Sequence, residues 1–175
     1  PFGIWRPGYP ESIEGYDQYD KLYADAKLWL NKGWIDYFTP QLYWKVNVIP
    51  QSFPVLLNWW QSENTKGRHL WPGMSISLGG DDKNVDEIVN KIMITRGIVP
   101  QSKGAVHWSI AGLAKHQLLR EGLIKGPYQK QALVPASKWL DDKKPLKPSV
   151  TTSPVGNMLQ IKWNHNEPSD VFRWV

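Results

Sequence analysis

A twelve-residue stretch near the start of the chain most restricts what it can fold into. Residues 33–44 read GWIDYFTPQLYW. The stretch opens on a glycine that can end a helix, and it continues as an aromatic and β-branched run of strand character. Helical patterns precede it over residues 16–32 and follow it over residues 52–60. A buried strand between two helices, with polar and aromatic residues at its carboxyl end, predicts one unit of an α/β fold.

The same alternation of strand and helix continues along residues 1–125. Further strands are predicted at residues 2–6, 68–76 and 104–110, and further helices at 85–96 and 113–121. The order βαβαβαβα predicts a parallel sheet with helices outside it. Four such units make half of an eight-stranded TIM (β/α)8 barrel. An open doubly wound sheet is the alternative, although no glycine-rich phosphate loop follows any of these strands.

The pattern changes after residue 125. Residues 126–147 are rich in proline and carry the charge run Asp141–Lys144, which indicates a linker. In the segment 148–175, residues 149–152 and 158–163 alternate apolar and polar side chains on the two sides of Gly156, which predicts antiparallel strands. A first strand led by a proline and a second strand that carries a tryptophan resemble the start of a fibronectin type III sandwich. Such a domain needs about seven strands and roughly 100 residues, so we expect a truncated one.

Composition restricts the kind of partner. The net charge is +5, but the basic residues are scattered, which does not favour nucleic acid as a partner. No apolar run approaches the roughly 20 residues that span a bilayer. The absence of cysteine excludes disulfides and thiolate metal sites. His69 and His107 lack a third ligand, so we expect no metal and no cofactor. Eleven tryptophans favour a carbohydrate protein, since sugar rings pack on flat aromatics.

Four sequence motifs together carry a family resemblance. They are PFGIWR at residues 1–6, YADAKLW at 23–29, the stretch at 33–44, and NWW at 58–60. In this order they resemble the second half of the glycosyl hydrolase-like 10 family, bacterial envelope proteins with a TIM-barrel core. The resemblance implies that residues 1–125 are the C-terminal half of such a barrel. It also implies a periplasmic or extracellular glycosidase (O-glycosyl hydrolase) that acts on a polysaccharide, with peptidoglycan glycan strands as one candidate.

Barrel active sites lie at the carboxyl ends of the strands, which selects the candidate residues. Tyr43 could hydrogen-bond an acetamido oxygen or stabilise a developing charge, and Gln41 could hold sugar hydroxyls. Arg6 could pair with a catalytic carboxylate and keep it ionised. The structural alternatives are a core tyrosine, a glutamine that serves a neighbouring loop, and an ion pair that only joins strands. Asp36 lies near the start of its strand and is expected to be structural.

Aromatic residues complete the predicted substrate site. Trp108 could form the floor of a sugar subsite, with Trp44 or Trp5 as its wall, and core packing is the alternative for all three. His107 could donate a hydrogen bond or act as an acid or base. The alternative is a histidine that is only a satisfied polar residue of the barrel.

The carboxylates needed for hydrolysis are not apparent in this sequence. Glycoside hydrolysis usually needs two carboxyl groups, and no pair of the sixteen Asp and Glu residues falls at inward-facing strand ends. The local alternatives, Asp81 and Asp82, are expected to be loop charges or helix-start anions. Two hypotheses therefore remain. Either the catalytic acid lies in a missing N-terminal half and this piece alone is inactive, or the protein is a non-catalytic carbohydrate binder or scaffold on a degenerate barrel. Half a barrel exposes an open edge, so the missing half or a second copy would complete the fold.

Overall fold

The computed structural model describes residues 1–76, 82–101, 104–144 and 146–164, without the side chains of 82–84. The chain forms two compact units, Pro1–Ala136 and Ser137–Val175, and each is described by itself. Among the described residues, no helix combines the length and apolar character that crossing a membrane requires.

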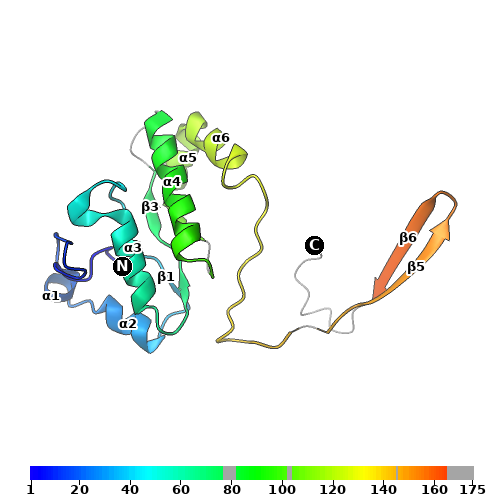
Figure 1. Cartoon of the computed structure of the whole chain (residues 1–175), viewed down its shortest axis with the longest axis horizontal. Helices are drawn as coiled ribbons and strands as arrows, with labels where there is room; N and C mark the ends of the chain where they lie inside the picture. The colour runs from blue at the N-terminus through cyan, green and yellow to red at the C-terminus, as the bar shows by residue number, and fades with distance from the viewer. Residues whose placement is uncertain (77–81, 102–103, 145, 165–175) are drawn as a thin grey trace. The chain divides into compact units, whose positions relative to one another are not determined.

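Helices make up most of the regular structure in the first unit (Figure 1). Their bounds are α1 Gln18–Leu22, α2 Ala26–Lys32, the short 3-10 helix η1 Ile49–Gln51, α3 Phe53–Glu63, α4 Asp82–Ile98, α5 Ile110–Lys115 and α6 Gln117–Lys125.

The single helix predicted over residues 16–32 is wrong, since the structure has α1 and α2 there. Tyr23 adopts a left-handed conformation (φ 52°) that ends α1, and the Asp25 side chain then caps α2 by accepting a hydrogen bond from Leu28 N. The predicted stop at Gly33 is confirmed: this glycine takes φ 68° at the C-cap of α2, a conformation that glycine adopts without strain.

The strands of the first unit are short and parallel. They are β1 Tyr37–Phe38, β2 His69–Leu70, β3 Gly73–Ser75 and β4 Val106–Trp108. β1 pairs with β2, and β3 pairs with β4, both in parallel. Parallel bridges also join Phe2 to Gln41 and Gln41 to Gly73. The segments thus lie side by side in chain order, which agrees with the predicted alternation of strand and helix.

Pro72 separates β2 from β3 within residues 68–76, which the sequence predicts as one strand. Proline has no N–H to donate to a sheet ladder, so regular pairing stops there. The chain nevertheless continues alongside its neighbour, because Trp71 N donates to Phe38 O and Gly73 N donates to Pro40 O.

The hydrophobic core lies between one face of these strands and the helices. Phe38, Leu70 and Met74 are buried on the strands, and α3 buries Leu56 and Trp60 against them. The apolar residues of α3 recur at three- and four-residue steps, so the helix turns one continuous apolar stripe inward. α3 packs beside α4, and α4 beside α6, in front of the strands in Figure 1.

The opposite face of the strands carries exposed side chains. Tyr37 is 58% exposed, Val106 40% and Trp108 63%, and Gln41 is exposed as well. Successive side chains of a strand point to opposite faces, so burying Phe38 and Met74 on one side turns these residues to the other. We call this side of the sheet the open face.

In its described part, the second unit contains an antiparallel hairpin of β5 Ser149–Val155 and β6 Met158–Asn164. Gly156 makes the turn with φ 59°, and every residue of both strands is exposed. The antiparallel pairing predicted for this region is therefore confirmed for the hairpin. The rest of the predicted fibronectin-like segment, residues 165–175, lies outside the described residues, and that domain stays a prediction.

Candidate functional site

The carboxyl ends of the strands bring Gln41, Ser75 and Trp108 to the open face. Gln41 is bridged to Gly73, which pairs with Val106, and Ser75 pairs with Trp108. Paired residues of neighbouring strands point to the same face, as do residues two apart along one strand. Gln41, Ser75 and Trp108 therefore share one face at one end of the sheet.

Gln41 is held by its backbone, while its side chain remains available. Its N–H donates to Pro1 O at 3.0 Å. The side-chain amide makes no hydrogen bond to any residue in the described part of the chain. An amide offers both donors and an acceptor, so it can bind a vicinal pair of hydroxyl groups.

Tyr43 and Trp44 follow directly after this strand end. Tyr43 is half-buried, and burial raises the pKa of its phenol, which keeps the hydroxyl protonated as a hydrogen-bond donor at neutral pH. Trp44 is packed against Phe2, with ring centroids 5.5 Å apart and an interplanar angle of 89°. Trp44 is also partly buried against the hydrophobic core, which is the core packing given above as the alternative to a subsite wall.

A buried charge network holds the loop beyond Trp44, and the sequence analysis missed it. Val46 N donates to Glu87 Oε1 at 2.8 Å, and Lys91 Nζ lies 3.7 Å from the same oxygen. Lys91 is only 2% exposed, and this burial lowers the pKa of its ammonium group. The Glu87–Lys91 spacing of four residues on a helix was a signal that could have indicated the pair.

Arg6 and Trp5 form contacts with the helices of the first unit. Arg6 Nε lies 3.3 Å from Asp17 Oδ2, at the N-cap of α1. Trp5 Nε1 donates to Asp25 Oδ1 at 3.1 Å. Arg6 is thus in an ion pair that joins the first segment to α1, and not to a neighbouring strand as the structural alternative expected. Trp5 donates to the N-cap residue of α2 and is packed against the hydrophobic core, which was the alternative given for it.

His107 lies on the opposite face of β4 from Trp108, because the two residues are adjacent in one strand. Its Nε2 is 2.6 Å from the Tyr128 hydroxyl, and its Nδ1 is buried without a partner in the described part of the chain. Burial lowers the pKa of the imidazole, which keeps it neutral at pH 7. The structure therefore separates His107 from Gln41 and Trp108.

Acidic residues give no further candidates among the residues that the structure describes. Asp36 is exposed just before β1, at the amino end of the sheet. Asp81 and the side chain of Asp82 lie outside the described residues. Within the described ranges, no cluster of three or more His, Cys, Asp or Glu side chains could hold a metal ion.

Comparison with known proteins shows similarity to proteins named glycosyl hydrolases, although no protein-family model matches the chain. The chain is 37% identical over 178 residues to glycosyl hydrolase YngK of Bacillus subtilis, an alignment that covers 93% of this chain and 34% of YngK. It is 27% identical over 143 residues to glycosyl hydrolase DigH of Escherichia coli K12, with 76% of this chain and 31% of DigH covered. The chain thus spans about a third of the length of these curated relatives. The similarity supports a glycosyl hydrolase-like family.

Proposed function

We propose that residues 1–125 are the C-terminal half of a TIM-barrel glycoside hydrolase of the glycosyl hydrolase-like 10 family. Its substrate would be an amino-sugar polysaccharide of the bacterial envelope, with peptidoglycan glycan strands as the first candidate. The observation that carries the proposal is the placement of Gln41 and Trp108 on one open face, at the carboxyl end of parallel strands. The named relatives support the reaction class.

The exposed side chains on this face suit a sugar ring. Trp108 presents a large aromatic surface, on which the C–H face of a pyranose can pack. Gln41 can pair with hydroxyl groups, and the protonated Tyr43 hydroxyl can donate to an acetamido oxygen. These residues bind and orient the substrate. By this proposal, the acid and the nucleophile or base are carboxylates of the N-terminal half of the barrel, since glycoside hydrolysis usually needs a pair of them.

The half-barrel is supported by the order of the strands. Segments of four consecutive βα units lie in parallel and in chain order, and α3 and α4 pack on the face that carries Phe38 and Met74. An N-terminal half would cover the amino-end part of the open face, where Tyr37 and Val106 are exposed, and would leave the carboxyl end accessible. Alone, this piece would expose that apolar surface and would lack the catalytic acid. By the same proposal, residues 148–175 begin a fibronectin type III-like domain.

The second candidate function is a non-catalytic carbohydrate-binding or scaffolding protein on a degenerate barrel. It is favoured by one observation: the described part of the chain places no carboxylate pair at the carboxyl end of the strands. Acidic residues at the strand ends of the N-terminal half would favour the enzyme, and their absence would favour the binder.

The test is an assay of the full-length protein on purified glycan strands, with fragment release followed by chromatography. Gln41→Ala and Tyr43→Phe are expected to lower kcat/KM by at least about tenfold, the effect of losing one hydrogen bond to a bound sugar. Trp34→Ala, which removes another exposed side chain, serves as the control and should leave kcat/KM unchanged. Unchanged turnover in both site variants would remove the site assignment, and full-length protein that binds but never cleaves would favour the second candidate.

A further inference from the structure

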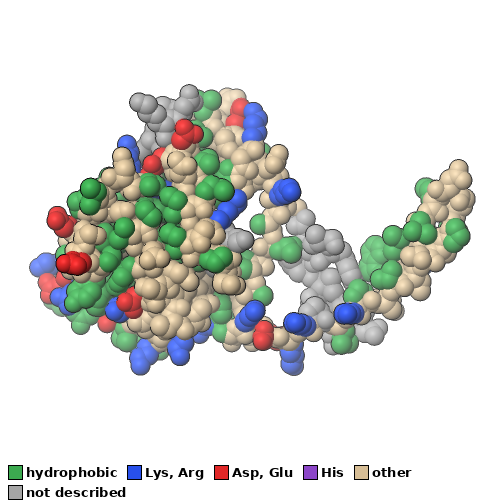
Figure 2. Space-filling model, viewed as in Figure 1, with side chains coloured by type: hydrophobic (Ala, Val, Ile, Leu, Met, Phe, Trp, Pro, Cys, Tyr) green, Lys and Arg blue, Asp and Glu red, His purple; other side chains and the backbone are tan. Residues whose placement is uncertain are grey.

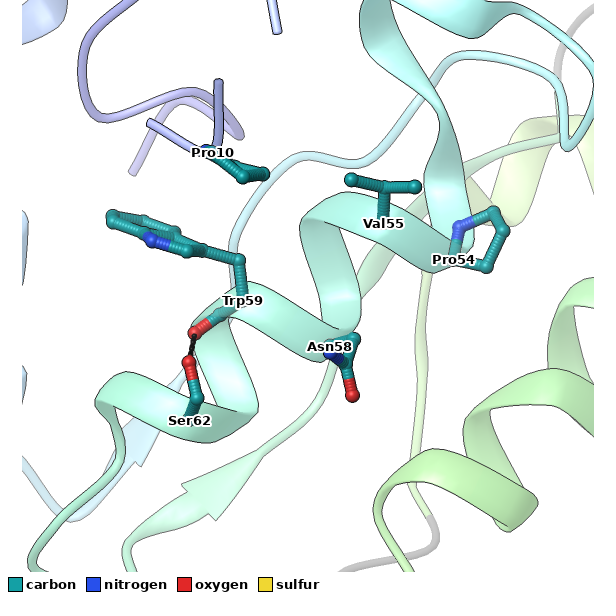
Figure 3. Close-up of a pocket in the computed structure, with 6 residues that line it drawn as sticks. All are labelled: Pro10, Pro54, Val55, Asn58, Trp59 and Ser62. Atoms are coloured by element: carbon teal, nitrogen blue, oxygen red, sulfur yellow. Dashed lines mark hydrogen bonds between the residues drawn. The ribbon is translucent and has the colours of Figure 1, made fainter. Parts of the chain in front are cut away.

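A shallow pocket lies on the outer side of α3, away from the strands. It has a volume of about 330 Å³ and is lined by Pro10, Pro54, Val55, Asn58, Trp59 and Ser62. Five of these residues come from successive turns of α3, and Pro10 comes from the loop after the first parallel segment (Figure 3). We call it the α3 pocket. Its size is at the small end of the range for ligand sites, which suits a single ring rather than a long ligand.

The lining of the α3 pocket is uncharged and amphipathic. Trp59, Val55 and the two prolines supply apolar surface, and Asn58 supplies an exposed amide. The Asn58 amide makes no hydrogen bond to any described residue, whereas Ser62 Oγ donates to Trp59 O at 2.7 Å. In Figure 3, Pro10 lies between the Trp59 ring and Val55, over α3, and all three residues line the pocket.

The Trp59 ring is held in place by its neighbours. It stacks on Trp5, with ring centroids 6.0 Å apart and planes 20° apart. It also makes an edge contact with Trp60, with ring centroids 4.7 Å apart. Lys27 Nζ lies 5.6 Å from the Trp59 ring centroid. A ring that is already fixed loses little conformational entropy when a ligand packs on it, so this geometry favours binding.

The charges near the α3 pocket are neutralised within the chain. Lys27 Nζ is 2.9 Å from Glu63 Oε1, and Arg6 is paired with Asp17. Figure 2 shows green hydrophobic side chains over the area of α3, with red and blue side chains mainly around that area. An anionic or cationic ligand would therefore find no unpaired countercharge among the lining residues.

From this geometry we propose that the α3 pocket is a second saccharide site, which binds one uncharged pyranose ring of a glycan outside the site at Gln41 and Trp108. A pyranose combines an apolar C–H face with hydroxyl groups, which matches the indole and the amide of this pocket. The choice of a glycan rests on the carbohydrate substrate of the proposed function, but the pocket does not require the open face to be catalytic. Such a site would hold one part of a glycan polymer against the protein while another part of the same polymer is cleaved.

The experiment measures binding of a soluble N-acetylglucosamine tetramer to the full chain by calorimetry. Val55→Arg fills the pocket with a charged side chain, and Asn58→Ala removes the amide. Both positions are exposed on α3, so both variants should fold. We expect each to raise Kd by about tenfold, or about 1.4 kcal/mol. The matched control, Trp34→Ala, removes an exposed indole outside the pocket and should not change Kd.

A Gln41→Ala variant separates this proposal from the proposed function. If Gln41→Ala abolishes binding while Val55→Arg and Asn58→Ala do not, the α3 pocket is not a saccharide site and the open-face site stands. If none of the proteins binds the tetramer, the α3 proposal is overturned, whatever the full-length protein hydrolyses. A proline-rich decapeptide is tested in parallel. Binding of the peptide, lost in Val55→Arg, without binding of the sugar would also overturn the proposal.

Discussion

The buried indole of Trp60 donates its Nε1–H to the carbonyl oxygen of Gly3 at 2.7 Å. This hydrogen bond connects α3 to the first parallel segment, across 57 positions of sequence. Trp60 also packs on Phe38, with ring centroids 4.6 Å apart. One side chain thus links a helix to two neighbouring segments of the sheet, and it does so beneath the strand that leads to Gln41.

Trp60→Phe should lower the free energy of unfolding by about 1–3 kcal/mol, because the Gly3 carbonyl would then be buried without a partner. Urea denaturation followed by circular dichroism measures this difference. Trp34→Phe is the matched control, since Trp34 is 67% exposed, and it should change stability by less than about 0.5 kcal/mol. Equal midpoints for the two variants would show that the Trp60 hydrogen bond contributes nothing.

Gly3→Ala should be destabilising by about 1–3 kcal/mol, because the new methyl group would collide with Gln41 O and lie 2.9 Å from Trp44 Cζ3. The same change at Gly97 offers a matched control. Gly97 is exposed in α4, and a methyl group there would meet nothing within 4 Å. Gly97→Ala should therefore stabilise the chain by about 0.5–1 kcal/mol, through helix propensity. Thermal unfolding of both variants measures the two changes in stability. An increase in stability for Gly3→Ala as well as for Gly97→Ala would contradict the packing described at Gly3.

Lys91 should make stability depend on pH in the alkaline range. Burial lowers its pKa in the folded state below the ordinary value of 10.5, so the unfolded chain binds the proton more tightly. Stability must then rise with pH between the lowered pKa and about 10.5, where the unfolded lysine also loses its proton.

Lys91→Met removes this contribution, so the difference in unfolding free energy between the original chain and the variant should change as the pH rises towards 10.5. Lys125→Met provides the comparison, because Lys125 forms the same i,i+4 pair, with Glu121, at a side chain that is 76% exposed. A flat difference for Lys91→Met across this range would contradict the effect of burial on its pKa.

His107 should make the chain less stable as the pH falls below 6.5. Burial lowers the pKa of its imidazole in the folded state, so the unfolded chain takes up the proton first and is favoured by acid. The pKa of His69 is lowered by burial as well, and the two residues act in the same direction. His107→Gln should flatten the loss of stability between pH 7 and 5. An unchanged slope in denaturation at these two pH values would exclude His107 as a source.

The sequence predicted the order and the parallel pairing of the segments, because a helix between two strands brings the second strand back parallel to the first. It did not predict the break between α1 and α2, since the apolar spacing continues through the single left-handed residue Tyr23. The partners of Arg6 and Trp5 lie 11 and 20 residues away, and no local pattern identifies such pairs.

One error at the candidate site was avoidable. His107 and Trp108 are consecutive residues of a strand, so the two-residue period of side-chain direction already separates them. A single binding face can include only one of them. The structure assigns the open face to Trp108, because His107 is paired with Met74, which is buried in the core. The alternation does not say which of the two residues points to the core. That depends on which face of the strand the helices cover, and it is decided by packing between distant segments.

Trp108→Ala should separate binding from folding in the full-length protein. In the present chain the side chain is 63% exposed, so its removal should change the free energy of unfolding of this chain by less than about 0.5 kcal/mol. If a sugar packs on the indole equally in the ground state and in the transition state, removing the indole weakens both by the same amount. KM should then rise about tenfold while kcat stays nearly constant. Kinetics on glycan strands together with urea denaturation measure the two quantities. A fall in stability of several kcal/mol with unchanged KM would instead make Trp108 a packing residue, and the open face would lose its aromatic subsite.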